Sequence, residues 1–223
     1  MSANHSLVLF EGNVTGMLPA VFECFGLKSV GTFETAKGQA ELWDYTNWPR
    51  RGRPRNVVHK GVLTNGTWTA VMDREMTMIG DQEKCEACAA KFKIKIFGYM
   101  IESVSGTCGL YLYAPEKIRG LTIQNFEIME DFGDPLPQEA DISTEEMLRD
   151  GPMRIVRRMG FSDTLFAHPS SKILIVGLED PTRTQTLEQS TGGFAHVGGK
   201  GTNKQTTPNA TGQNANKPWW KFW

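Results

Sequence analysis

The sequence predicts an α+β domain, with a mainly antiparallel sheet and a few short helices packed on it, followed by a disordered C-terminal tail. Asn65-Gly66 lies between the β-prone runs 57–63 and 67–72, which is the strongest short-range signal of a hairpin. Ser105-Gly106 lies between two further runs of this kind. Such short connections join antiparallel neighbours, because parallel strands need long crossovers. We expect the helices to pack on one face of the sheet.

Further strands are expected where apolar residues cluster or alternate. The segment Lys91–Phe97 alternates lysine with phenylalanine or isoleucine, and a period of two predicts a strand with one buried and one wet face. The other expected strands are Leu7–Phe10, Val30–Thr35, Ala40–Tyr45, Leu121–Met129 and Lys172–Leu178.

Two early helices are predicted from their end signals. Pro19 and Gly26 enclose a short helix at 20–25, because proline favours the first helical turn and glycine the end. Asp81 is placed to cap a helix that runs to about Ala90.

A later helix is marked by a capping box at Ser143 and Glu146, and Ile142 with Met147 matches the hydrophobic staple. Gly151-Pro152 interrupts this helix and restarts it, and Gly160 ends it.

The organisation follows from composition. We expect a single domain at 1–180, a disordered polar linker at 181–216 and an aromatic docking tip at 217–223. The linker is rich in Gly, Thr, Asn and Gln, and such a segment cannot bury enough apolar surface to offset the entropy of ordering. From residue 181 onward there are five basic residues and one acid, a net charge of +4, which leaves −5 for residues 1–180.

The tip is the most unusual part of the chain, because it holds three of the six tryptophans of the whole sequence. Its binding residues are expected to be Trp219, Trp220, Lys221, Phe222 and Trp223. Four aromatic side chains at about 150–250 Å² each give roughly 15–25 kcal/mol of gross burial. Ordering five residues costs about 5–10 kcal/mol, and association costs at least ~4 kcal/mol more. The tip therefore favours reversible docking in a protein pocket, on a partner or another copy; folding back on its own domain and lying at a membrane surface are the alternatives.

Cys85 and Cys88 have the spacing of half a zinc site or of a redox pair. No second close pair of ligands accompanies them, and they fall inside a predicted helix, where two small buried side chains are the simpler interpretation. We expect no metal and no cofactor. The N-terminus has no basic region before its apolar run, and no stretch of 18 apolar residues occurs, so a cytoplasmic protein with reduced thiols is expected.

Asp73 and Glu75 follow a strand, where carboxylates can bind a divalent ion or transfer protons. The simpler interpretation is that both face water beside Arg74. We assign no catalytic residue, and a metal-dependent hydrolase or nuclease at these two acids is kept as the rival to a binding role.

The segment Arg50–Arg55 holds four arginines just after Trp43, Tyr45 and Trp48, which suits either nucleic acid or an acidic surface. The acidic charge of the body makes nucleic acid the less favoured partner. The segment 127–150 carries nine acids and one base, and it is either a solvated helix and loop or a face for a basic partner.

Four runs carry a family resemblance: Gly66–Glu75, Glu102–Thr107, Leu110–Tyr113 and Phe132–Glu139. Within residues 57–160 they resemble uncharacterised bacterial domains found near toxin–immunity and other conflict genes. No catalytic residues are established for such domains, so the resemblance assigns none.

The sequence as a whole favours a non-enzymatic protein that binds another protein, of immunity type or associated with defence. A membrane-surface adaptor that uses the aromatic tip is the third class kept open.

Overall fold

The computed structural model describes residues 4–35, 56–74, 76–102, 104–115, 117–162, 164–168 and 171–181. These belong to one compact unit, Met1–Thr184, with which the following paragraphs deal. The expected strand at 40–45, the arginine-rich loop, Glu75 and the whole of residues 182–223 lie outside the described residues.

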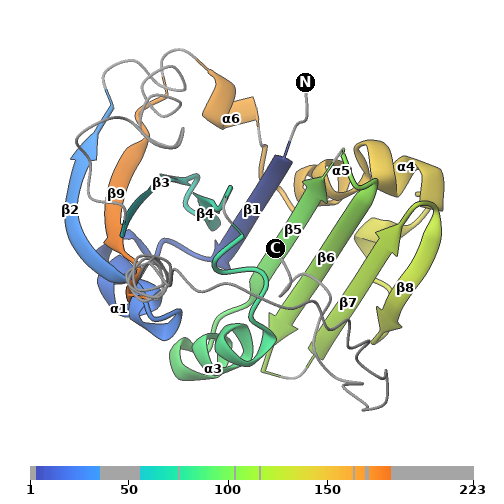
Figure 1. The fold of residues 1–223 in the computed structure, drawn as a ribbon, viewed down its shortest axis with the longest axis horizontal. Coiled ribbons are helices and arrows are strands. Elements are labelled where there is room, and N and C mark those ends of the chain that lie inside the picture. The colour runs from blue at the N-terminus through green and yellow to red at the C-terminus, as the bar shows by residue number, and fades with distance from the viewer. Residues whose placement is uncertain are drawn as a thin grey trace, which may run out of the picture. The chain divides into compact units, whose positions relative to one another are not determined.

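Within the described residues, nine strands form one sheet in the order β2-β9-β3-β4-β1-β5-β6-β7-β8 (Figure 1). Every pairing between neighbours is antiparallel. The predicted fold class is therefore confirmed. The strands are β1 (Asn4–Glu11), β2 (Lys28–Glu34), β3 (Val57–Thr64), β4 (Trp68–Met72), β5 (Ile96–Glu102), β6 (Thr107–Ala114), β7 (Lys117–Gln124), β8 (Glu127–Phe132) and β9 (Leu174–Glu179).

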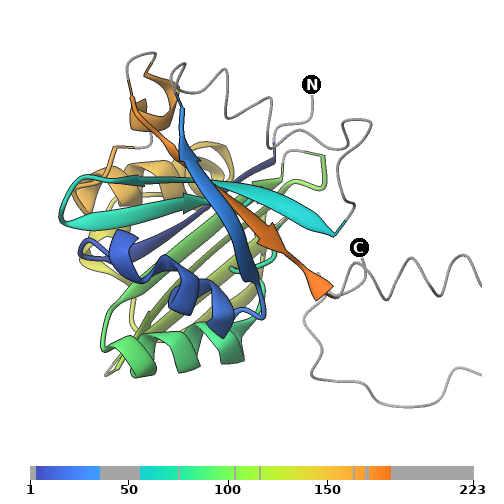
Figure 2. The ribbon, with the colours of Figure 1, turned by 90° about the vertical axis from the view of Figure 1, so that its left-hand side faces the viewer.

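Helices cover both faces of the sheet, so the expectation of a single covered face is wrong (Figure 2). α4 (Thr144–Arg149), α5 (Gly151–Arg158) and α6 (Thr164–Ala167) pack on one face and form the first core with it. α1 (Leu18–Cys24) and α3 (Gln82–Phe92) pack on the other face and form the second core. The central strands need two covers because they are apolar on both sides: Leu7, Val8, Leu9 and Phe10 are all buried.

The predicted helix starts are confirmed by their caps. The side chain of Asp81 accepts a hydrogen bond from the backbone N–H of Lys84 at 3.2 Å. Ser143 and Glu146 form the reciprocal capping box at the start of α4. Each cap satisfies backbone N–H groups that the first helical turn leaves without partners.

Two predicted strands are wrong in their extent. Lys91 and Phe92 complete α3, and Lys93 ends it in the left-handed conformation with φ 53°, so β5 begins only at Ile96. The alternating lysines before β5 thus belong to the end of α3 and the turn that follows it, and they do not mark a strand. The expected strand 121–129 is instead the hairpin of β7 and β8, which turns at Asn125 and Phe126 with φ of 50° and 69°.

An aromatic layer lies over glycines in the second-core face of β6 and β7. Tyr111 stacks on Tyr113 with ring centroids 6.3 Å apart and lies 6.5 Å from Phe132. Gly120 stands opposite Tyr111 in β7, and a Cβ atom there would lie 2.2 Å from the Phe132 ring. The Phe132 ring therefore occupies the space that a side chain at position 120 would need.

Gly120→Ala should lower the free energy of unfolding by about 1–3 kcal/mol, because the methyl group overpacks the site of Phe132. Gly31→Ala in the edge strand β2 is the matched control, since a Cβ atom there meets nothing within 4 Å. It should change stability by about 0.5 kcal/mol or less. Urea unfolding measures both, and equal midpoints for the two variants would contradict the packing described.

Candidate functional site

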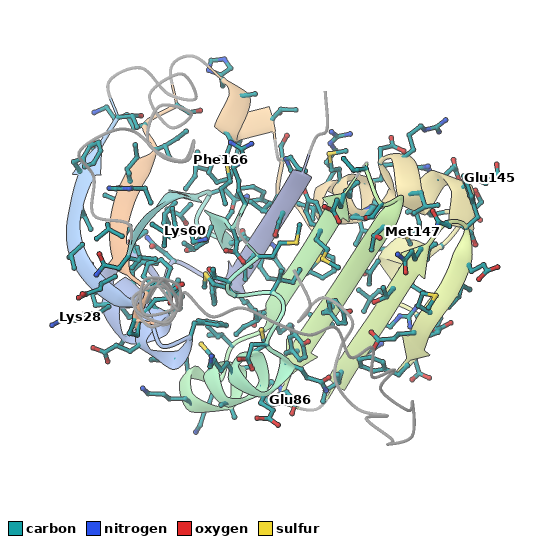
Figure 3. All side chains as sticks on the ribbon, viewed as in Figure 1. Lys28, Lys60, Glu86, Glu145, Met147 and Phe166 are labelled. Atoms are coloured by element: carbon teal, nitrogen blue, oxygen red, sulfur yellow. The ribbon has the colours of Figure 1, made fainter. Side chains whose placement is uncertain are left out.

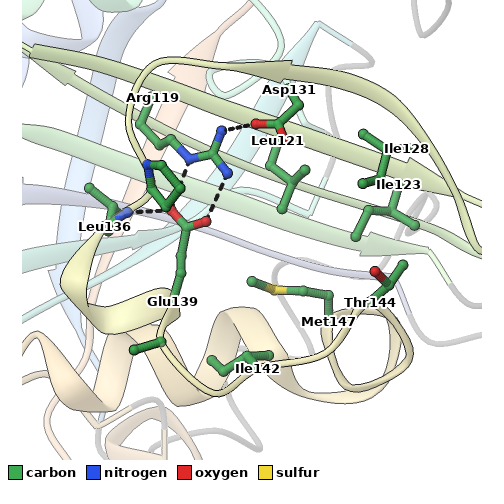
Figure 4. Close-up of a pocket in the computed structure, with 12 residues that line it drawn as sticks. Arg119, Leu121, Ile123, Ile128, Asp131, Leu136, Glu139, Ile142, Thr144 and Met147 are labelled. Carbon is green, nitrogen blue, oxygen red and sulfur yellow. Dashed lines mark hydrogen bonds and ion pairs between the residues drawn. The ribbon is translucent and has the colours of Figure 1, made fainter.

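The candidate site is a groove between the sheet and the segment that follows β8 (Figure 4). We call it the β8 groove. Its volume is about 340 Å³, and its walls are β7 and β8 on one side and the 3₁₀ helix η2 (Pro137–Glu139) with α4 on the other. Its apolar lining includes Leu121, Ile123, Ile128, Leu136, Ile142 and Met147.

Arg119 closes one end of the groove. Its side chain is 2% exposed. Nε and Nη2 donate to the two carboxylate oxygens of Glu139, at 2.9 and 2.8 Å. Nη1 donates to Asp131 and to the carbonyls of Gly120 and Phe132. The hydrogen bonds to Glu139 raise the pKa of Arg119, and those to Asp131 add to the effect, although burial opposes it. All three guanidinium nitrogens therefore donate within the fold, and the role of Arg119 is structural.

Glu139 connects this arginine to the wall of the groove. Besides the two bonds from Arg119, it accepts a hydrogen bond from the backbone N–H of Leu136 at 2.9 Å. Leu136 belongs to the first core, as does Met147 of α4. The carboxylate thus fixes the turn at 136–139 against β7, and the groove has a defined wall on both sides (Figure 4).

The outer rim of the groove is apolar and exposed. Among the strands that the structure describes, β8 lies at one edge of the sheet, and Ile128 on it is 55% exposed while also lining the groove. Met129 and Phe126 are exposed beside it, and the register of β8 against β7 shifts at Met129. Large apolar side chains gathered at a sheet edge are typical of interaction surfaces.

Acidic side chains surround this rim. Of the nine acids in segment 127–150, Asp131 and Glu139 pair with Arg119, Glu146 with Arg154, and Asp150 with Arg149. Glu130 accepts hydrogen bonds from Tyr111 and Thr122. The four remaining acids are exposed and form no ion pair within the described residues: Glu127, Asp134, Asp141 and Glu145. Glu145 lies at the outer margin of the molecule in Figure 3. Their combined charge is available to a partner.

Asp73 lies in the interior and serves the fold. Asp73 and Lys60 are both 0% exposed, and the lysine Nζ donates to the carboxylate at 2.5 Å (Lys60 is labelled in Figure 3). The carboxylate also accepts from Thr77 and from the backbone N–H groups of Met78 and Ile79. Both oxygens are thus engaged, and the turn at 76–79 is held against the second core.

The pKa of Asp73 is set by opposing effects. Burial raises this pKa. The charge and hydrogen bond of Lys60 and the N–H groups of Met78 and Ile79 lower it, and together they outweigh burial, so the pKa of Asp73 lies below its ordinary value. The expectation that Asp73 faces water is wrong, and its environment is that of a structural ion pair.

Three of the four cysteines, Cys85, Cys88 and Cys108, are buried free thiols, and Cys24 is partly exposed. Cys85 and Cys88 face the second core from α3, and Cys108 lies in the first core. Burial raises the pKa of Cys88 and of Cys108 to about 12, so neither is a thiolate at neutral pH. No group of three or more metal-ligating side chains is present in the part of the chain that the structure describes.

The structure places only part of the predicted site. The acidic segment 127–150 is brought to one edge, as β8, η2 and α4. The tip residues, Trp219 to Trp223, lie outside the described residues. Arg119 and the apolar floor were not predicted as a site, although a single arginine inside the apolar run 118–123 was a signal of a buried ion pair.

Comparison of the chain with protein-family models, curated proteins and solved structures finds no match. The resemblance to bacterial conflict-associated domains therefore stays a prediction. Among the described residues, no helix is both long and apolar enough to cross a membrane.

Arg119→Lys should lower the free energy of unfolding by about 1–3 kcal/mol, because lysine cannot form the forked pair with Glu139. The loosened wall should also shift the NMR methyl signals of Leu136 and Met147. Arg149→Lys is the control, since Arg149 is exposed and its ion pair with Asp150 is long, at 3.6 Å, and contributes little to stability. Equal stability of the two variants would contradict the role given to Arg119.

Asp73→Asn should lower the free energy of unfolding at pH 7 by about 3–5 kcal/mol, because it leaves the charge of Lys60 buried without its counterion. The lowered folded-state pKa means that the contribution of Asp73 is complete above its unfolded value of 3.8 and is lost as the pH falls below it. The stability gap between wild type and variant should therefore narrow below that pH in urea titrations. Asp134→Asn, at an exposed position, should show no such gap.

Proposed function

We propose that this protein is a non-enzymatic binding protein that recognises a basic segment of another protein in the β8 groove. The observation that carries the proposal is the combination of an apolar groove, an exposed apolar rim at Ile128 and four exposed acids without ion pairs within the described residues. An apolar centre with a charged margin is the usual composition of a protein interface.

The charge supports a basic partner. Residues 1–180 carry a net charge of −5, and the segment 127–150 contributes nine acids and one base. Opposite charge speeds the encounter of two proteins and disfavours partners of like charge. A basic nuclease toxin is the kind of partner that such a surface fits, and with the family resemblance this favours an immunity-type or defence-associated role.

The aromatic tip is a second contact in this proposal, and it rests on the sequence alone. Tryptophan is among the residues that most often anchor interfaces, and Trp219, Trp220 and Trp223 are placed together with Phe222 and Lys221. We propose that this tip docks in a pocket of a protein. A cytoplasmic location belongs to the same proposal, supported by the four free cysteines.

The rival hydrolase at Asp73 has no support from the geometry. Its carboxylate is 0% exposed, and both oxygens accept hydrogen bonds from within the fold. A metal-ion or proton-transfer role requires a carboxylate that substrate or water can reach.

Affinity capture with immobilised variants tests the proposal. Ile128→Lys should reduce capture of the partner about tenfold or more, because it places a charged head at the apolar rim and cancels part of the acidic charge. Val30→Lys is the matched control: Val30 lies on the opposite edge strand, β2, and is 53% exposed, against 55% for Ile128. A protein counts as the partner only if Val30→Lys retains it, Ile128→Lys loses it, and the purified pair reproduces this difference in Kd.

Salt and truncation separate the two contacts. Raising the ionic strength should weaken capture through the groove, since exposed charges are screened. A chain that ends at Asn216 tests the tip. Equal capture by Ile128→Lys and Val30→Lys would contradict the groove, and equal capture by the full and shortened chains would contradict the tip.

A further inference from the structure

We infer that the β8 groove binds its partner as an added β-strand, in which apolar side chains facing the groove alternate with basic side chains on the opposite face. This inference rests on the proposed function and specifies the chemistry of the segment that the site recognises.

The first support is the free edge of β8. No described strand pairs with its outer side, because β8 is the last strand in the sheet order. Gln124 and Glu127 are opposite each other and flank a two-residue turn at Asn125 and Phe126 with positive φ. Residues that flank such a turn form a hydrogen-bonded pair, so the next residue, Ile128, directs its N–H and C=O away from β7. That backbone is positioned to pair with an incoming strand.

The second support is the different character of the two faces of β8. Ile128 is opposite Ile123 and Asp131 is opposite Leu121, and all four residues line the groove. On the other face, Glu127 is opposite Gln124 and Glu130 is opposite Thr122. Glu130 there accepts a hydrogen bond from Tyr111, which packs in the second core. One face of β8 is thus continuous with an apolar groove. The other face carries Glu127 and Glu130, and Phe132 packs beside Tyr111 at the end of the strand.

An added strand inherits this difference, because successive side chains of a strand point to opposite faces. Its groove-facing residues would cover the exposed side chain of Ile128, and its other residues would lie beside Glu127 and Glu130. Apolar residues fit the first set of positions, and lysine or arginine fits the second. β8 has six residues, 127–132, which sets the length of the recognised segment at about six.

The same charges argue against a second copy of this chain as the occupant. Antiparallel pairing of β8 with β8 would place six acidic side chains, Glu127, Glu130 and Asp131 of each copy, on two adjacent strands. Like charges opposite one another destabilise a sheet, and edge strands are commonly protected from self-pairing by charge. A basic strand meets no such repulsion.

Two synthetic hexapeptides with blocked ends test the inference on the full chain. One alternates, Lys-Val-Lys-Val-Lys-Val, and the other has the same composition in blocks, Lys-Lys-Lys-Val-Val-Val. The alternating peptide should bind at least about tenfold more tightly in NMR titrations. It should also slow the hydrogen exchange of the Ile128 amide by about tenfold at saturation, because that N–H enters a hydrogen bond.

Two substitutions separate the backbone from the side chain. Ile128→Ala removes only the side chain, whereas Ile128→Pro also removes the outward N–H and leaves the hydrogen bonds to β7 in place. The proline variant should bind the alternating peptide at least about fivefold more weakly than the alanine variant, with both variants folded by circular dichroism. Should the proline variant unfold, the exchange measurement on the wild type decides alone.

The failures of the two proposals are distinguishable. Equal binding of both peptides with unchanged exchange at Ile128 would overturn strand addition and leave a charged groove that binds by side chains. Absence of binding by either peptide would also overturn strand addition, while the capture experiment with Ile128→Lys judges the groove independently. A dimer in analytical ultracentrifugation that Glu130→Lys abolishes would show that a second copy is the occupant and would overturn the inference.

Discussion

The forked pair between Arg119 and Glu139 is the interaction on which the arrangement of the edge depends. It joins β7 to the turn that leads from β8 into α4. Because Asp131 of β8 also pairs with Arg119, the guanidinium group contacts β7, β8 and this turn. Buried ion pairs are weak sources of net stability, because desolvation consumes most of the attraction. Their directional hydrogen bonds nevertheless fix geometry. Arg119 therefore matters to this fold by positioning: with Glu139 it fixes the turn at 136–139 against β7 and so defines one wall of the β8 groove.

The sequence predicted the elements with strong local signals and misjudged those decided by tertiary context. Asn65-Gly66 and Ser105-Gly106 identified their hairpins, because glycine adopts positive φ without cost. The turn at Asn125-Phe126 was missed, since phenylalanine at positive φ is unusual and has no sequence signature. The lysine alternation before β5 was taken for a strand, although the cap at Asp81 already starts a helix long enough to include its first residues.

The site was predictable in its charge and not in its shape. The density of acids in 127–150 was visible, but their distribution into paired and unpaired groups depends on partners far along the chain, such as Arg154 for Glu146. Asp73 shows the converse. Acids after a strand can serve catalysis or the fold, and the partner that decides, Lys60, becomes apparent only when β3 and β4 are placed side by side. The second helical layer was likewise hidden, since unbroken apolar runs such as Leu7–Phe10 were not interpreted as buried on both faces.

The position of β9 has a kinetic consequence. This strand is the last of the described strands along the chain, yet it lies between β2 and β3, two of the earliest. During synthesis β2 therefore cannot pair with the sheet until residues 174–179 have been made, and the edge of β3 that pairs with β9 stays open for the same time. Contacts between such distant parts of a chain are slow to form, and open strand edges are prone to wrong pairings in the interval. The first and last residues of β2, Lys28 and Glu34, are charged and would limit such pairings. The edge of the sheet formed by β2 is therefore completed only after β9 has been synthesised.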